Sequence, residues 1–163
     1  MNPLELTADM LTRNLEMLKA TLADFSDADM LIRPTPGANH AAWQLGHLAT
    51  SETRMLNLVA PGAAADLPDE FTSRFTKETT SSDDPAGFPG KQELLEAMGK
   101  VRAASVRWVK RLSPADLDRS TPERLHGFAP TIGHFTQMLP LHATMHIGQF
   151  QVIRRKLGKP ILF

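Results

Sequence analysis

Two histidines near the end of the chain, His142 and His146, lie four residues apart in a segment whose pattern predicts a helix. Four residues of α-helix correspond to about 6 Å along the axis and about 40° of rotation, so the two imidazoles share one face. A helix offers two nitrogen ligands to one metal ion in this way. Unrelated histidines also occur at this spacing, so the surrounding residues are needed to judge whether the pair binds a metal ion.

The face that carries this pair is otherwise apolar. Its residues in chain order are Phe135, Met138, His142, His146, Gln149, Ile153 and Leu157. Three polar side chains on a face predicted to be buried each cost a few kcal/mol unless they have partners. A bound metal ion would satisfy the imidazoles. Gln149 would then hydrogen-bond a water on the ion or orient a ligand ring, with the capping of a neighbouring helix as an equal alternative.

A divalent ion bound by a protein usually has at least three protein ligands, so a third donor is needed. His134 lies eight residues before His142, about 12 Å along the same helix, and is out of reach. His126 falls in a predicted loop, which leaves its position unconstrained. His40 and His47 are seven residues apart on a second predicted helix, and geometry does not choose between them, although His47 is deeper within that helix.

Composition narrows the function classes. The 163 residues fit one domain spanning residues 1–163, and 18 basic residues balance 18 acidic ones. Without a basic excess, nucleic-acid binding is not expected. The absence of cysteine excludes disulfides, thiolate ligands and a thiol nucleophile of the protein's own. No apolar stretch of about 18 residues and no signal-peptide pattern is present, so we expect a cytoplasmic protein without a membrane partner.

Four amphipathic segments predict helices, and no segment predicts a strand. They cover residues 2 to about 25, about 39 to 60, about 91 to 112 and about 131 to 157. In the first, Leu11, Leu15, Leu18 and Leu22 recur at the spacing of a helix that packs in a bundle. The expected fold is therefore all-α, a four-helix bundle with long connecting loops. The pattern does not decide whether the irregular residues 61–90 form a lid or are mobile.

Three further features invite interpretation. Glu52 interrupts the apolar stripe of the second helix and is either an acceptor for a metal ligand, a general base, or the partner of Arg102 or another cation of the third helix. Trp43 and Trp108 are expected in the core, and the basic residues 154–156 are expected to be a solvated helix end.

Two motifs carry a family resemblance. The sequence Trp43-Gln44-Leu45-Gly46-His47-Leu48-Ala49 on the second helix is followed near the end by His142-Ala-Thr-Met-His146-Ile-Gly148-Gln149. In this order, and with the bundle pattern, they resemble the DinB/YfiT-like superfamily of metalloproteins, over nearly the whole chain. The resemblance implies a four-helix bundle of up-down-down-up topology. It also implies that His47 joins His142 and His146 in a metal site, which geometry alone leaves open.

The expected function follows from this ligand set. Three neutral imidazoles leave a divalent ion its charge and an open position, which is typical of catalytic sites; zinc or nickel is the expected ion. Characterised relatives in the family include thiol-dependent transferases and isomerases. We therefore expect an enzyme that activates an external small thiol for transfer to an electrophilic small-molecule substrate. The alternatives are a metal-dependent hydrolase that uses bound hydroxide, with Glu52 as base, and a non-catalytic bundle for binding or homodimerisation.

Overall fold

The computed structural model describes residues 2–162, and within them the chain is helical and contains no β-strand. Its long helices are α1 (Pro3–Leu22), α3 (Ala41–Val59), α5 (Lys91–Val109) and α6 (Ile132–Lys156). Two short helices, α2 (Asp27–Met30) and α4 (Asp69–Thr72), and four single 3₁₀ turns lie in the connections. The predicted all-α bundle is confirmed. None of the described helices is long and apolar enough to cross a membrane.

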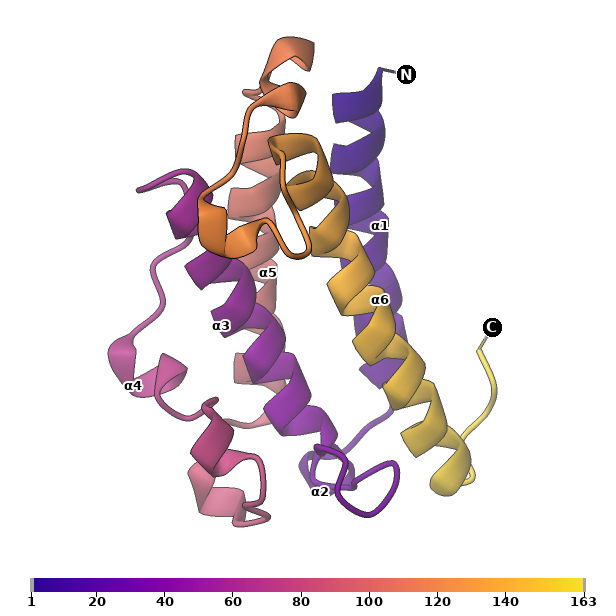
Figure 1. The fold of residues 1–163 in the computed structure, drawn as a ribbon. Helices are drawn as coiled ribbons and strands as arrows, with labels where there is room; N and C mark the ends of the chain where they lie inside the picture. Colours follow the sequence, from indigo (N-terminus) through magenta and orange to yellow (C-terminus); the bar gives the residue numbers. More distant parts are fainter. Residues whose placement is uncertain (1, 163) are drawn as a thin grey trace.

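The four long helices form a bundle of two parallel pairs, and the two pairs run in opposite directions (Figure 1). Helices α1 and α6 run side by side in one direction, whereas α3 and α5 run side by side in the other. This is the predicted up-down-down-up topology. Because α3 ends where α5 does, the chain must return along the whole bundle before α5 begins. That return accounts for the length of the segment 61–90.

Local capping explains where the helices begin. Asn2 and Glu5 form a reciprocal capping box at the start of α1. Thr131 accepts a hydrogen bond at the start of α6, and His40 caps α3 by accepting the amide of Trp43 at 3.1 Å. The short α2 was not predicted, although Ser26 and Asp29 form a capping box that marks it.

The interior consists of two apolar clusters with buried polar side chains between the helices. Trp43 belongs to one cluster and Trp108 to the other, and both are largely buried, as predicted. Glu52 of α3 and Arg102 of α5 form an ion pair of 3.1 Å with exposed fractions of only 4% and 1% for their side chains. A buried pair of this kind fixes the register of α3 against α5 at the cost of desolvating both charges.

The segment 61–90 is packed against the bundle. Phe71, Phe75 and Phe88 are buried in the same cluster as Trp43. The ring of Phe75 lies against Gly46, where a Cβ would come within 2.1 Å of the ring carbons. The segment therefore lacks helical periodicity because its isolated aromatic residues, rather than a continuous stripe, hold it to α3.

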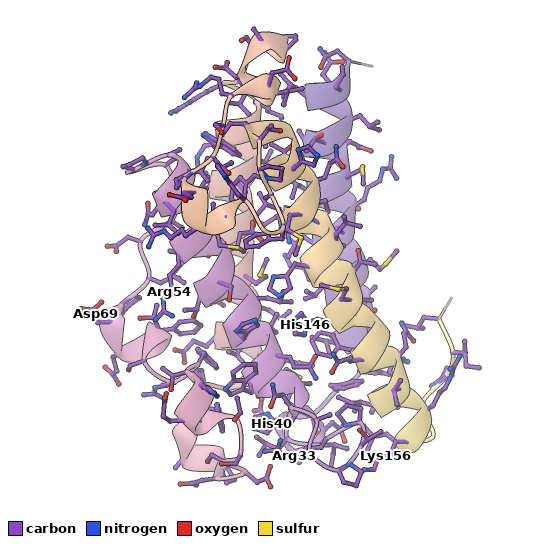
Figure 2. The ribbon with its side chains drawn as sticks, in the orientation of Figure 1. Arg33, His40, Arg54, Asp69, His146 and Lys156 are labelled. Carbon is purple, nitrogen blue, oxygen red and sulfur yellow. The ribbon has the colours of Figure 1, made fainter. Side chains whose placement is uncertain are left out.

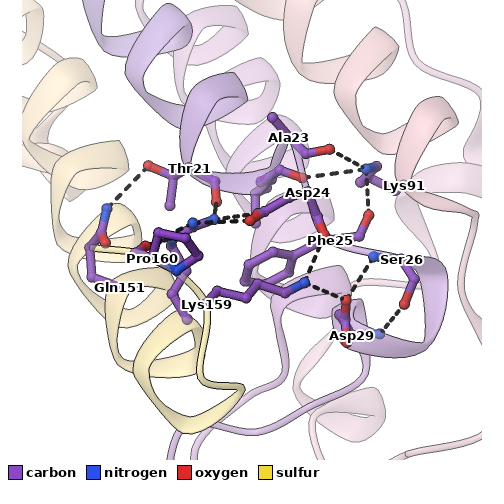
Figure 3. Close-up of polar contacts among 12 residues, drawn as sticks. Thr21, Ala23, Asp24, Phe25, Ser26, Asp29, Lys91, Gln151, Lys159 and Pro160 are labelled. Atoms are coloured by element: carbon purple, nitrogen blue, oxygen red, sulfur yellow. Dashed lines mark hydrogen bonds and ion pairs between the residues drawn. The ribbon is translucent and has the colours of Figure 1, made fainter. Parts of the chain in front are cut away.

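The expectation that residues 154–156 are a solvated helix end is wrong for Arg154. Its side chain is 2% exposed and forms hydrogen bonds to the carbonyls of Thr21 and Pro160 and an ion pair with Asp24. Lys159 is bound in the same way to Asp29, at 3.1 Å (Figure 3). The chain after α6 folds back onto the α1–α2 connection, which buries Arg154.

Candidate metal centre

The histidines implied by the family resemblance lie together. His47 comes from α3 and His142 and His146 from α6, and Figure 2 shows His146 in the space between these two helices. The ring of His47 lies 5.4 Å from that of His142 and 5.6 Å from that of His146, measured between centroids. Each residue offers one nitrogen within 4.8 Å of the other two. Within residues 2–162 no other group of three or more potential ligand residues meets this criterion.

The donor set fits a divalent ion of the borderline class. Nε2 of His142 and Nε2 of His146 are 3.3 Å apart. Two nitrogens bound about 2.0–2.1 Å from one ion at a tetrahedral angle are separated by roughly the same distance. Imidazole nitrogens are suitable ligands for zinc, nickel, copper and iron. His47 and His142 are partly exposed, whereas His146 lies deeper in the site.

A glutamine that the sequence interpretation passed over orients the third histidine. The side-chain amide nitrogen of Gln44 donates to the carbonyl of Asn39, so its oxygen is the acceptor for Nδ1 of His146, at 2.7 Å. Nδ1 must then carry the hydrogen, which leaves a lone pair on Nε2, the atom beside His142. Gln44 is 1% exposed. The signal available in the sequence was a glutamine in the first turn of the second helix, three residues before His47.

Trp43 supports the first histidine. Its indole stacks on the ring of His47 at a centroid distance of 4.8 Å and an interplanar angle of 11°. The indole nitrogen donates to the hydroxyl of Thr79 at 3.0 Å. On the next turn of α3, the hydroxyl of Ser51 lies 3.3 Å from Nδ1 of His47. The orientation of this ligand therefore depends on the packed segment 61–90 as well as on α3.

The environment of the site keeps its histidines neutral. Burial, followed by the nearby His142 and Arg54, lowers the pKa of His47 to about 4. Burial also lowers the pKa of His146 to about 3, with smaller contributions from His142 and His47. The pKa of His142 is lowered as well, first by burial and then by the charge of Arg102. A metal ion requires neutral imidazoles, so the pKa values favour its ligands at neutral pH.

Of the three roles considered for Glu52, the structure shows the ion pair with Arg102. Its other carboxylate oxygen accepts a hydrogen bond of 2.6 Å from Ser105, also on α5. Burial raises the pKa of the Glu52 carboxyl, and the Arg102 charge and the Ser105 hydroxyl partly oppose that change. In the described residues, none of its hydrogen bonds or ion pairs reaches a histidine of the cluster.

The placement of Gln149 on the buried face of α6 is wrong, because its side chain is exposed. The buried line of this helix passes through Phe135, Leu139, Ala143, Ile147 and Phe150. The two histidines lie at the edge of that face, next to α3, and Gln149 lies further round the helix. The expected line through His142, His146 and Gln149 lies beside the buried one and also contains apolar residues, so the two are difficult to distinguish by periodicity.

The remaining histidines have ordinary hydrogen-bonding roles. His40 caps α3 and bonds through Nε2 to the carbonyl of Ser82 at 3.1 Å. His126 contacts the carbonyl of Thr121 at 2.8 Å, and His134 contacts the hydroxyl of Thr131 at 2.8 Å.

Known proteins with the same fold share this architecture. A conserved protein from Enterococcus faecalis superposes with a TM-score of 0.70 at 21% identity, covering 98% of this chain and 99% of its own. YfiT from Bacillus subtilis, described as a probable metal-dependent hydrolase with an unusual four-helix bundle topology, superposes with a TM-score of 0.65 at 16% identity. The match covers 96% of this chain and 89% of YfiT.

Sequence similarity identifies the family of this chain. No curated protein matches the chain. The family model described as the DinB superfamily matches residues 10–150, which include both histidine motifs. The chain therefore belongs to the DinB superfamily.

Proposed function

We propose that this protein is a metal-dependent enzyme that activates an external small thiol for transfer to an electrophilic small molecule. His47, His142 and His146 would hold the ion, for which zinc and nickel are the candidates. The observation that carries the proposal is the ligand set itself: three neutral imidazoles, two of them partly exposed, and no thiolate or carboxylate among the clustered residues. Such a set is typical of catalytic sites that keep one position open.

A bound divalent ion would lower the pKa of a thiol that coordinates it, so that the thiolate is available at neutral pH. Gln44 and Trp43 hold two of the imidazoles in fixed orientations, which limits the reorganisation needed on binding. In the transfer, the thiol proton leaves to solvent and a sulfur electron pair forms a bond to the electrophilic carbon. The leaving group departs with the electrons of its bond to that carbon.

The position of Glu52 favours thiol transfer over hydrolysis. A hydrolase of this type needs a base within reach of the attacking water, and a carboxylate is the usual choice. Glu52 is engaged with Arg102 and Ser105 on α5, and within residues 2–162 none of its hydrogen bonds or ion pairs reaches a histidine of the cluster. Hydrolysis remains the second candidate because the similar fold of YfiT is described as that of a probable metal-dependent hydrolase.

The test uses protein purified without a metal-affinity tag and loaded with cobalt. Titration with glutathione, cysteine and coenzyme A, one at a time, should produce a thiolate-to-metal absorption band with at least one of them. The same thiol should then be consumed in the presence of an activated alkyl or aryl halide. The His142→Ala variant should lose both signals, and His134→Ala, whose side chain lies outside the cluster, should keep them.

Two results would contradict the proposal. One is a cobalt spectrum that no thiol changes, combined with metal-dependent cleavage of an activated ester, which would favour hydrolysis. The other is outright unfolding of the chelated protein, which would identify the ion as a structural support. We expect the chelated protein to keep its helical circular dichroism, because two apolar clusters stabilise the bundle without the site.

A further inference from the structure

The outer side of α6 carries a row of large apolar side chains that no part of residues 2–162 covers. Leu141 is 55% exposed, Met145 57% and Val152 42%, and Gly148 belongs to the same row. The spacings of four, three and four residues place the row along one face of the helix, opposite the buried line through Ala143 and Ile147. Single exposed apolar residues are ordinary, but an aligned row along three turns is not.

Helix α1 extends this surface. Leu6, Met10 and Met17 are 50%, 45% and 39% exposed. Met10 and Met17 each lie four residues before a side chain, Asn14 or Thr21, that bonds to α6. They therefore lie about 40° round the helix from the contact with α6, on the side away from the buried Leu11 and Leu18. We call these six large residues together with Gly148 the α1–α6 apolar face.

The α6 part of this face is free of charge. From Ile132 to Ile153 the helix contains no Asp, Glu, Lys or Arg. A partner with a charged surface, such as a nucleic acid or a strongly basic or acidic peptide, would find no complementary charge there. Two copies of the same helix, in contrast, can approach each other without like-charge repulsion. The charge pattern thus favours an uncharged apolar partner surface, which a second copy supplies.

The order of side chains in the row is complementary to itself. A two-fold axis between positions 146 and 147 of two antiparallel α6 helices pairs Leu141 with Val152 of the second copy, and Met145 with Gly148 of the second copy. The Cβ position of Gly148 has no atom within 4 Å, so the space for the Met145 side chain is open. This large-to-small pairing repeats on both sides of the axis, as an isologous interface requires.

We infer that the α1–α6 apolar face is the interface of a homodimer in which the two α6 helices pack antiparallel. At the exposed fractions given above, the six side chains present roughly 500 Å² of apolar surface, against about 800 Å² per partner in an ordinary stable interface. Neighbouring polar residues such as Thr144 would supply the remainder. The inference does not depend on the enzymatic proposal, because it concerns the face of α6 that points away from the bundle.

Sedimentation velocity at micromolar concentration tests the interface. The wild-type chain should sediment as a dimer, and Leu141→Glu should weaken association by about 100-fold or more, because each copy would bury a charge against Val152 of the other. The control is Phe128→Glu, which alters a 46% exposed residue outside the face and should leave the dimer intact. Circular dichroism and metal content should be the same for both variants, so that a folding defect is recognised.

Cross-linking tests the antiparallel pairing itself. Because the chain has no cysteine, a single Met145→Cys substitution provides a unique thiol near the proposed axis. A short bismaleimide should join two such chains, and it should not join chains that carry Gln92→Cys on α5. A monomeric wild type, a dimer that Leu141→Glu leaves unchanged, or preferential cross-linking through position 92 would each overturn the inference.

Discussion

Oε1 of Gln44 on α3 accepts a hydrogen bond of 2.7 Å from Nδ1 of His146 on α6. The helix that contributes the first histidine of the site thus also fixes the orientation of the last. The bond leaves Nε2 of His146 facing Nε2 of His142 at 3.3 Å, which is the arrangement that one ion requires.

We therefore expect Gln44→Ala to weaken metal binding by about 10- to 100-fold without changing the helical fold, because the imidazole loses the partner that selects its tautomer. Gln44→Glu keeps an acceptor and should restore most of the affinity. Gln137→Ala, at an exposed position of α6, serves as the control. Calorimetric titration with zinc measures the difference. Equal affinities for Gln44→Ala and the wild type would show that the bond does not organise the site.

Gly46 and Gly99 offer a matched pair of helical glycines. A Cβ at Gly46 would lie 2.1 Å from the ring of Phe75, whereas nothing lies within 4 Å of the corresponding position at Gly99. Gly46→Ala should therefore cost about 1–3 kcal/mol, because Phe75 has to move. Gly99→Ala should stabilise the protein by about 0.5–1 kcal/mol through helix propensity. Urea unfolding distinguishes the two, and equal shifts would contradict the close packing of residues 61–90 on α3.

The four long helices were predictable from the sequence because each has a continuous apolar stripe of helical period. The stripe of α6 was assigned to the line through His142, His146 and Gln149. The true buried line contains the small residue Ala143, whose weak apolar signal made the neighbouring line look equally good. Periodicity gives the face of a helix only to within about one residue, roughly 100° of rotation.

The site was predicted only in part, for a different physical reason. Two of its histidines share one helix, and their spacing is visible in the sequence. His47 and Gln44 reach them across the bundle from positions about a hundred residues earlier, a contact that no local pattern encodes. The packing of residues 61–90 was missed because Phe71 and Phe75 are isolated aromatics without periodic neighbours.

Glu52 and Arg102 should behave as a buried pair. Removing one partner leaves an uncompensated charge in the interior, so Arg102→Met or Glu52→Leu alone should destabilise the protein by about 3–5 kcal/mol. The double variant should be much closer to wild type, because both desolvation penalties are then removed. A double-mutant cycle from urea unfolding measures the coupling. Additive losses would show that the pair is not held together in solution.

Acidification should destabilise the metal-free protein through its site histidines. Burial lowers the pKa of His47 to about 4 and that of His146 to about 3, whereas an unfolded histidine has a pKa of about 6.5. Below about 6.5 the unfolded chain therefore binds protons that the folded chain does not, and the free energy of unfolding falls as the pH decreases toward 4. Well above pH 6.5 these histidines are neutral in both the folded and the unfolded chain, so they contribute no pH dependence to the free energy of unfolding.

Urea unfolding of chelated protein at a series of pH values measures this slope. The double variant His47→Gln/His146→Gln should lose part of it, since two of the groups with lowered pKa values are gone. His134→Gln, at an exposed position, should keep the full slope. An unchanged slope in the double variant would show that other groups cause the acid sensitivity.

The central claim is that His47, His142 and His146 together hold one divalent ion, and metal content after tag-free purification tests it most directly. The wild-type chain and His134→Ala should each contain one zinc or nickel ion per chain, whereas His47→Ala, His142→Ala and His146→Ala should each lose the stoichiometric ion while remaining folded. Retention of a full equivalent of metal by any of these three variants, or its loss in His134→Ala, would contradict the assignment.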